Sequence, residues 1–214
     1  MWFNFFISRG LVPDYLLRRG VRNQGKQRLQ MMKDTDLKQE YLTFLKEASS
    51  GEIAIHTDDA NNQHYEVDSE FFRYCLGKNL KYSSCYWNDD TSSLDEAEEI
   101  MLDLYCKRAK IKDGMTILDV GCGWGSLSLY LAQKYPKSKI TGVSNSNSQR
   151  TFIEKVAYER GLQNLKIITK DINSFNADEK FDRVISIEMF EHTKNSKKLM
   201  NSINKWLNSD GLFF

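Results

Sequence analysis

The stretch Ile117-Leu-Asp-Val-Gly-Cys-Gly-Trp-Gly125 decides the fold of this chain. A short apolar run followed by glycines at every second position is typical of a buried strand that turns directly into a helix. Such a turn lets the backbone approach a ligand, and the helix after it points N–H groups at that ligand. The spacing GxGxG, unlike GxGxxG, favours a ligand made of an amino acid and a nucleoside over a dinucleotide. For the glycines alone, a tight turn without a ligand is the alternative interpretation.

Strand and helix patterns alternate on both sides of this turn. Two capping boxes, Ser93-Leu-Asp-Glu96 and Ser146-Asn-Ser-Gln149, mark the starts of helices. Strands that alternate with helices of roughly 10 to 15 residues predict an α/β fold with a doubly wound parallel sheet. The expected strands span residues 115–120, 140–143, 165–169 and 183–188, and a fifth begins at residue 212.

The N-terminal part has a different pattern, with apolar residues at helical steps and no strand alternation. We therefore expect an N-terminal helical cap over residues 1–75 and a Rossmann-like domain over residues 76–214. The first 33 residues contain seven basic residues and one acidic residue, which indicates a solvated helix face or a surface for anionic lipid or an acidic substrate. Because Leu212-Phe-Phe214 would form a bare sheet edge, we expect the sheet to be incomplete and the chain to be C-terminally truncated.

Composition excludes several classes of protein. A hydrophobic share of 41% and a charged share of 28% are ordinary for a globular chain. A net charge of +1 provides no field for nucleic acid, so no nucleic-acid partner is expected. The four cysteines form no CxxC pair, which favours a reduced chain without a metal site. Without a secretion signal or an apolar run of about 20 residues, we expect a cytoplasmic protein with no stable membrane insertion. The sequence does not indicate an oligomeric state.

Four motifs in order carry a resemblance to a known family. The glycine stretch is similar to motif one of class I S-adenosylmethionine-dependent methyltransferases. Together the motifs resemble the cyclopropane-fatty-acyl-phospholipid synthase superfamily, and within it the coclaurine N-methyltransferase-like branch. The resemblance extends from about residue 11 to residue 214 and implies S-adenosyl-L-methionine as the cofactor. The motifs are Tyr82-Ser-Ser-Cys-Tyr-Trp87, the glycine turn, Val143-Ser-Asn-Ser146 and Glu188-Met-Phe-Glu-His192.

The resemblance also implies which residues bind this cofactor. The ammonium of its methionine part suits the Asp119 carboxylate, and its carboxylate suits the N–H groups of the glycine turn. After the second strand, a polar run ending in Gln149 replaces the acid that many cofactor folds use for ribose. Asp171 matches an adenine contact, with a turn or helix-capping role as the alternative. The implied set is Tyr82, Ser83, Asp119, Gly121, Gly123, Gly125, Ser144, Asn145, Gln149, Asp171 and Ile172.

Glu188, Glu191 and His192 are the expected catalytic residues. They follow the fourth strand, at the edge where open α/β sheets bind substrates. A histidine can accept a proton at neutral pH, and two carboxylates beside it can hold a cationic amine. The alternative is two helix-capping acids and a packed histidine. His64-Tyr65-Glu66 matches a family segment that folds over the cofactor, although a packed or surface role for His64 is the better interpretation.

The leading functional hypothesis is N-methylation of a small amine by in-line transfer, with deprotonation by His192 and a glutamate. One alternative is C-methylation or cyclopropanation of unsaturated acyl chains of a lipid. The resemblance weakens it, because cyclopropane synthases carry Cys where this chain has Ser84, followed by Cys85, and Gly where it has Glu188. Another alternative is a truncated module that binds the cofactor without catalysis.

Overall fold

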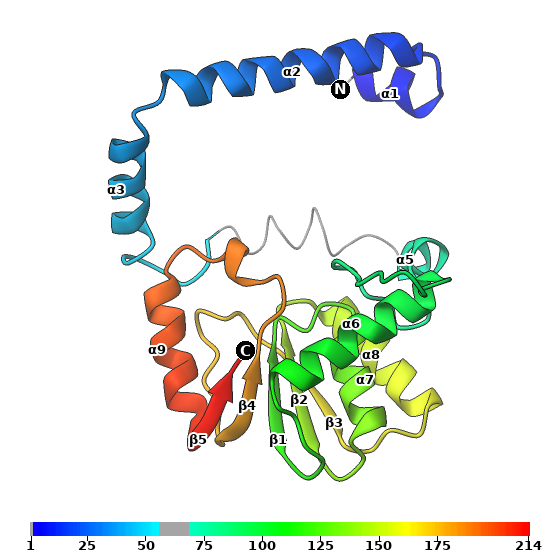
Figure 1. Ribbon diagram of the computed structural model, residues 1–214, viewed down its shortest axis with the longest axis vertical. Helices are drawn as coiled ribbons and strands as arrows, with labels where there is room; N and C mark the ends of the chain where they lie inside the picture. Colours follow the sequence, from blue (N-terminus) through cyan, green and yellow to red (C-terminus); the bar gives the residue numbers. More distant parts are fainter. Residues whose placement is uncertain (1, 56–68) are drawn as a thin grey trace. The chain divides into compact units, whose positions relative to one another are not determined.

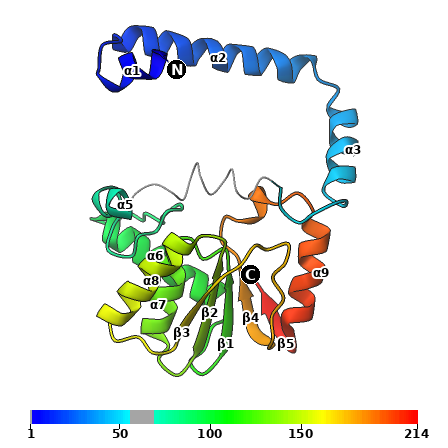
Figure 2. The ribbon, with the colours of Figure 1, turned by 180° about the vertical axis from the view of Figure 1, so that it is seen from behind.

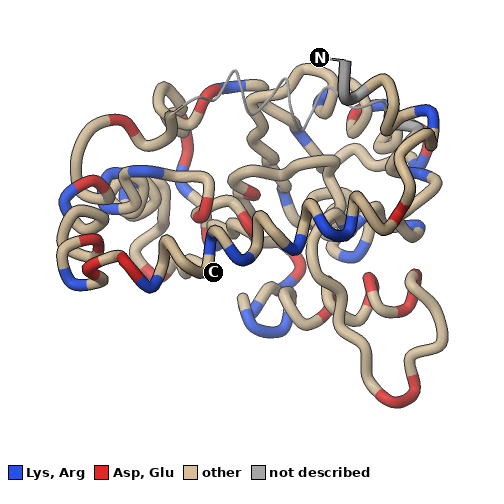
Figure 3. Tube along the Cα trace, turned by 90° about the horizontal axis from the view of Figure 1, so that it is seen from above, with Lys and Arg blue, Asp and Glu red and all other residues tan. Residues whose placement is uncertain are grey.

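The computed structural model describes residues 2–55 and 69–214, and the chain divides into two compact units, Met1–Lys46 and Glu47–Phe214 (Figure 1). The first unit is helical, and no side chain of its two longer helices is buried. Figure 3 shows Lys and Arg recurring along the longest helix, α2. The predicted N-terminal helices are therefore confirmed over these residues. They are α1 (Trp2–Ser8), α2 (Asp14–Asp34) and α3 (Leu37–Glu47), which extends one residue past the division.

The second unit contains a sheet of five parallel strands in the order β3-β2-β1-β4-β5. The doubly wound α/β prediction is confirmed. The strands are β1 (Thr116–Val120), β2 (Lys139–Ser144), β3 (Leu165–Thr169), β4 (Phe181–Ile185) and β5 (Leu207–Phe213). The helices are α5 (Ser69–Cys75), α6 (Leu94–Arg108), α7 (Ser126–Lys134), α8 (Asn147–Glu159), the 3-10 turn η2 (Phe190–His192) and α9 (Ser196–Trp206).

Helices cover both faces of the sheet because neighbouring strand residues point to opposite sides. In β1, Ile117 belongs to the core formed with Leu102 of α6 and Leu131 of α7. Its neighbour Leu118 belongs to the core formed with α9, through Leu199. In Figure 2, α6, α7 and α8 accordingly lie on one side of the sheet and α9 lies on the other.

The predicted helix starts at Ser93 and Ser146 are confirmed by their hydrogen bonds. The Ser93 hydroxyl accepts a bond from the N–H of Glu96, and the Ser146 hydroxyl accepts one from the N–H of Gln149, both at 3.3 Å. Each serine satisfies a helix N–H that has no partner within the helix. The two capping boxes therefore predict correctly where α6 and α8 begin.

The last two strands differ from the sequence prediction. β4 ends at Ile185, and Glu188 lies beyond it with a φ of 50°. β5 begins at Leu207, five residues before the predicted start at residue 212, and includes the polar residues in between. A register shift in its pairing with β4 absorbs these residues, because a bulge accommodates extra residues within a strand.

Part of the expected N-terminal cap packs with the sheet domain. Residues 47–55 and 69–75 belong to the second unit, and their buried side chains Ile53 and Phe72 join its cores. The carbonyl of Ile53 accepts bonds from the N–H groups of Lys194 and Asn195 at 2.7 and 3.1 Å. Within the described ranges, no helix is long and apolar enough to cross a membrane.

Candidate active site

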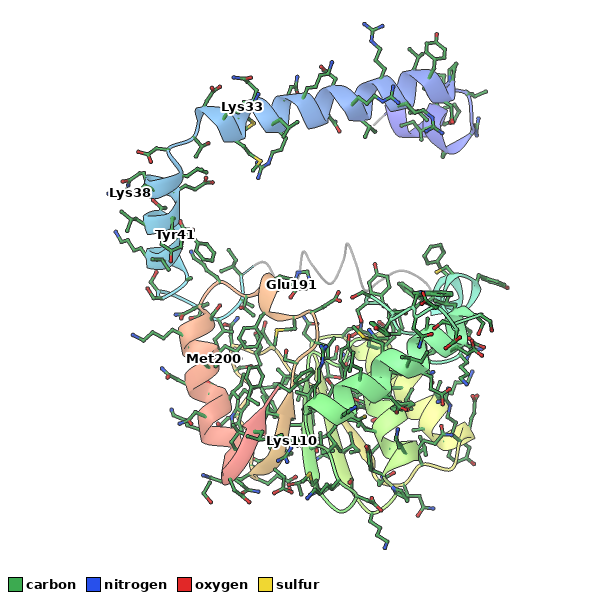
Figure 4. The ribbon with its side chains drawn as sticks, in the orientation of Figure 1. Lys33, Lys38, Tyr41, Lys110, Glu191 and Met200 are labelled. Carbon is green, nitrogen blue, oxygen red and sulfur yellow. The ribbon has the colours of Figure 1, made fainter. Side chains whose placement is uncertain are left out.

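The strand order places two functional loops beside each other. β1 lies between β2 and β4, so the chain reverses direction across the sheet at the β1/β4 boundary, which is where open α/β sheets bind ligands. The glycine turn follows β1, and the Glu188–His192 segment follows β4. Figure 4 shows Glu191 at this edge of the sheet. Two adjoining lobes of a cavity lie there, and their shared walls are Gly121, Gly123, Gln149, Glu188 and His192.

The three glycines of the turn have positive φ angles but different surroundings. A Cβ added at Gly121 would lie 2.7 Å from Cγ of Met189, and one at Gly125 would lie 2.5 Å from Cγ1 of Ile153. A Cβ at Gly123 would meet nothing within 4 Å. Gly121 and Gly125 therefore permit close packing, whereas Gly123 leaves open space in both lobes.

Asp119 is a buried acid at the end of β1 and lines the second lobe. Its carboxylate accepts a hydrogen bond from the Ser128 hydroxyl at 2.7 Å. Burial raises the pKa of this carboxyl to about 6. A cationic group in the second lobe would stabilise the ionised form.

Gln149 is buried between the two lobes and has one unsatisfied end. Its Oε1 accepts a bond from the Ser144 hydroxyl at 2.6 Å, which fixes the amide plane. Within residues 2–55 and 69–214, Nε2 of Gln149 has no hydrogen-bond partner, and neither do the buried Trp124 Nε1 and Ser126 Oγ. All three atoms belong to residues that line the cavity. Buried donors are normally satisfied, so these three groups are available to acceptor atoms of a ligand in the cavity.

The first lobe is completed by residues from three loops. Asn145 and Ile172 line it, together with Ala54. The side chain of Asn173 donates to the Ala54 carbonyl at 2.9 Å and accepts from its N–H at 3.1 Å. Asp171 does not line either lobe, and its Oδ1 accepts a bond from the N–H of Asn173 at 2.7 Å. This contact matches the turn role weighed for Asp171 from the sequence.

Glu98 of α6 anchors the segment that forms one wall of the second lobe. Its buried carboxylate accepts bonds from the N–H groups of Gly77, Asn79 and Lys81 at 2.9, 2.8 and 3.1 Å. We call residues 77–86 the strap. Because three bonds converge on one side chain, the strap is held against α6.

Tyr82 and Ser83 of the strap line the second lobe, as does the buried Lys81. The Lys81 ammonium donates to the Ser83 hydroxyl and lies 4.9 Å from the centre of the Tyr105 ring. Burial lowers the pKa of Lys81, although the neighbouring Cys85 side chain and the Glu188 and Glu98 carboxylates oppose this shift.

The predicted catalytic residues lie on the loop after β4. Glu188 and His192 line both lobes, and Glu191 lines the second. All three are exposed. Oε1 of Glu188 accepts bonds from the N–H and the hydroxyl of Ser84 at 3.4 and 3.1 Å. The site therefore combines two carboxylates and an imidazole beside the glycine turn.

The structure brings together every predicted site residue except Gly125 and Asp171, which do not line the cavity. The tripeptide His64-Tyr65-Glu66 lies outside the described residues. Sequence reasoning missed Lys81, Trp124 and Ser126. Their positions in the sequence could have identified them, because Lys81 directly precedes Tyr82, Trp124 lies within the glycine turn and Ser126 follows it.

Comparison with known proteins identifies the family. The profile of the mycolic acid cyclopropane synthetase family matches residues 54–214. The chain belongs to this family. It is 42% identical over 211 residues to (S)-coclaurine N-methyltransferase of Thalictrum flavum subsp. glaucum, covering 97% of this chain and 58% of that protein. It is 35% identical over 155 residues to cyclopropane-fatty-acyl-phospholipid synthase of Escherichia coli strain K12, covering 71% and 38% of the two chains.

Solved structures of family members show the same fold. A coclaurine N-methyltransferase bound to N-methylheliamine and SAH matches with a TM-score of 0.84 and 39% identity, covering 95% of this chain and 60% of that one. The mycolic acid cyclopropane synthase CmaA1 complexed with SAH and CTAB matches with a TM-score of 0.67 and 27% identity, covering 75% and 56%. The chain thus spans about 60% of the N-methyltransferase relatives it matches. The family resemblance read from the four motifs is confirmed.

Proposed function

We propose that this protein is an S-adenosylmethionine-dependent N-methyltransferase whose acceptor is a small amine of the coclaurine type. The observation that carries the proposal is the pair of lobes that meet at Gly123, Gln149, Glu188 and His192. We call the buried polar residues Asp119, Ser144 and Gln149 the donor side, and the exposed residues Glu188, Glu191 and His192 the acceptor side. The similarity to N-methyltransferases over 97% of this chain supports the same assignment.

The residues of the donor side fit the cofactor. Its ammonium would pair with Asp119, and its carboxylate would accept bonds from the first N–H groups of α7. Nε2 of Gln149, which has no partner in the described parts of the chain, would donate to the ribose oxygens. Ser144 would act through Gln149, because its hydroxyl already bonds to that side chain. When bound, the cofactor supplies a methyl group on a sulfonium centre.

Gly125 and Asp171 have supporting roles in this proposal. Gly125 allows Ile153 to pack beneath the glycine turn, and Asp171 holds the turn that presents Ile172 to the adenine side of the first lobe. Tyr82 and Ser83 would close the methionine end from the strap.

The acceptor side would bind the amine and remove its proton. A protonated amine has no free lone pair, so it must lose a proton before it can attack the methyl group. His192 would take that proton, and the carboxylates of Glu188 and Glu191 would hold the cation and stabilise the imidazolium. Alignment of the donor and acceptor atoms supplies most of the remaining rate enhancement.

An acyl-chain acceptor fits this site less well. An apolar chain placed against Glu188 and Glu191 would remove water from two carboxylates without providing a cation, which is energetically unfavourable. A module that binds the cofactor without catalysis is the other outcome that an assay can identify.

The test incubates the purified protein and S-adenosylmethionine with either heliamine or vesicles of unsaturated phospholipid, followed by mass spectrometry. The proposal predicts an added methyl group on heliamine and none on the lipid. Methylation or cyclopropanation of the lipid alone would contradict it. Cofactor binding without any product would instead favour the non-catalytic module.

A further inference from the structure

Two hydrogen bonds connect the strap to Glu188 on the acceptor side. The N–H and the hydroxyl of Ser84 both donate to Oε1 of Glu188, although the two residues are 104 positions apart in the chain. Within the described residues, no other hydrogen bond reaches the Glu188 side chain. Its Oε2 is therefore left for a ligand in the cavity that Glu188 lines.

The hydrogen bonds from Ser84 matter because no helix or strand holds the Glu188 side chain in one position. It lies beyond the end of β4 and before η2, so no regular element constrains it. Its φ of 50° is a left-handed conformation that costs about 1–2 kcal/mol for a residue with a side chain. An exposed glutamate in a loop otherwise samples several rotamers, and ordering it on binding would weaken the affinity for substrate.

Ser84 is well placed to supply this constraint, because the strap is anchored on both sides of it. On one side, the N–H of Lys81 donates to the buried Glu98 carboxylate at 3.1 Å. On the other side, the N–H of Tyr86 donates to the carbonyl of Ala97 at 3.3 Å. Both acceptors belong to α6. The Ser84 donors are thus fixed relative to the sheet domain.

We propose that Ser84 is a positioning residue that holds one oxygen of Glu188 so that the other oxygen receives the amine. This role rests on the proposed function. The Ser84–Glu188 contact links the strap, which would close the methionine end of the cofactor site, to the carboxylate that would bind the amine. Ser84 itself acts through Glu188 and does not contact the reacting atoms.

The test compares Ser84→Ala with Ser84→Thr in methylation of heliamine. Loss of a charge-assisted bond predicts about a tenfold lower kcat/KM for heliamine in Ser84→Ala. The dissociation constant for S-adenosylmethionine, measured by calorimetry, stays within twofold of the wild-type value. Ser84→Thr retains the hydroxyl and restores most of the activity. In a Glu188→Gln background, Ser84→Ala has a smaller effect than in the wild type, because the two residues act as one unit.

Ser92→Ala is the matched control. The N–H and the hydroxyl of Ser92 donate to Oε2 of Glu96, each at 2.8 Å, at an exposed helix start away from the cavity. This variant loses the same kind of contact and keeps the wild-type kcat/KM. Wild-type kcat/KM in Ser84→Ala, or equal losses in Ser84→Ala and Ser92→Ala, would overturn the role of Ser84 while the proposed function stands. Failure of the wild-type protein to methylate heliamine would overturn the proposed function, and the role of Ser84 with it.

Discussion

The donor side and the acceptor side of the cavity are built differently. On the donor side, Asp119, Ser144 and Gln149 are 2%, 6% and 2% exposed and lie within β1, β2 and α8. On the acceptor side, Glu188 and His192 are exposed and lie on the loop and 3-10 turn after β4. The donor side is therefore fixed by the packing of regular elements, whereas the acceptor side depends on individual hydrogen bonds. We expect substitutions on the two sides to have separable effects on cofactor affinity and on turnover.

The largest expected effect is on turnover in His192→Ala. Removal of a general base lowers kcat by about 10²- to 10⁴-fold. The dissociation constant for S-adenosylmethionine stays near the wild-type value, because the donor side is intact. Steady-state kinetics with heliamine and calorimetry with the cofactor measure the two quantities. The exposed Lys197 of α9 provides the control variant, Lys197→Ala. A parallel loss of cofactor affinity in His192→Ala would show that the two sides are not separable.

The next largest effect is on stability, at the glycines. Gly125→Ala adds a Cβ at a φ of 82° and 2.5 Å from Ile153. Strain and overpacking together lower the free energy of unfolding by about 2–5 kcal/mol. Gly114→Ala is the matched control, with a φ of 90° and open space around the Cβ. In this variant only backbone strain lowers the free energy of unfolding, by about 1–2 kcal/mol. Equal losses in urea unfolding would contradict the packing role of Gly125.

A third prediction concerns the pH dependence of cofactor binding. Burial raises the pKa of Asp119 to about 6, and the cofactor's ammonium pairs with the ionised form. The dissociation constant therefore falls about tenfold between pH 5 and pH 7, as the carboxyl loses its proton. The Asp119→Asn variant binds more weakly and without this dependence. A wild-type affinity that is constant over this range would contradict the role of Asp119.

The same shift affects the stability of the free protein. The folded carboxyl keeps its proton up to about pH 6, whereas the unfolded carboxyl releases it near 3.8. Between these values the unfolded state binds fewer protons, so the contribution of Asp119 to the free energy of unfolding falls as pH rises. In Asp119→Asn this decrease of the free energy of unfolding with rising pH is absent. Urea unfolding of both proteins at several pH values measures the difference.

The smallest expected effect separates the backbone of Glu188 from its side chain. Glu188→Gly and Glu188→Ala both remove the carboxylate, and both lower turnover of heliamine. They differ in stability, because only glycine adopts a φ of 50° without strain. Glu188→Gly is therefore about 1 kcal/mol more stable than Glu188→Ala. Equal stability in thermal unfolding would show that the left-handed backbone at this position is not maintained.

The donor side could be predicted from the sequence because local signals specify it. The glycine turn and the Ser146 capping box fix β1, β2 and the start of α8, and these elements position Gln149. The polar partners were harder to predict. The bond from Ser144 to Gln149 is local, but the bonds from the strap to Glu98 span about 20 residues. No sequence pattern indicates that a helix glutamate will accept three distant N–H groups.

The acceptor side could be predicted only in part. The residues Glu188, Glu191 and His192 were identified from a motif, but the end of β4 was placed three residues too late. Apolar Ile187 continues the strand pattern past Ile185, while the backbone turns at Glu188. The Ser84–Glu188 contact joins residues 104 positions apart, and only the tertiary fold brings them together.

Calorimetry of S-adenosylmethionine with the wild-type protein, Gly123→Trp and Gly114→Trp tests directly whether the cofactor binds at the glycine turn. Gly123 and Gly114 both have positive φ angles and open space, but only Gly123 lines the cavity. We expect the wild-type protein and Gly114→Trp to bind the cofactor and a folded Gly123→Trp not to bind it. Unchanged binding by Gly123→Trp, or no binding by a folded wild-type protein, would contradict it.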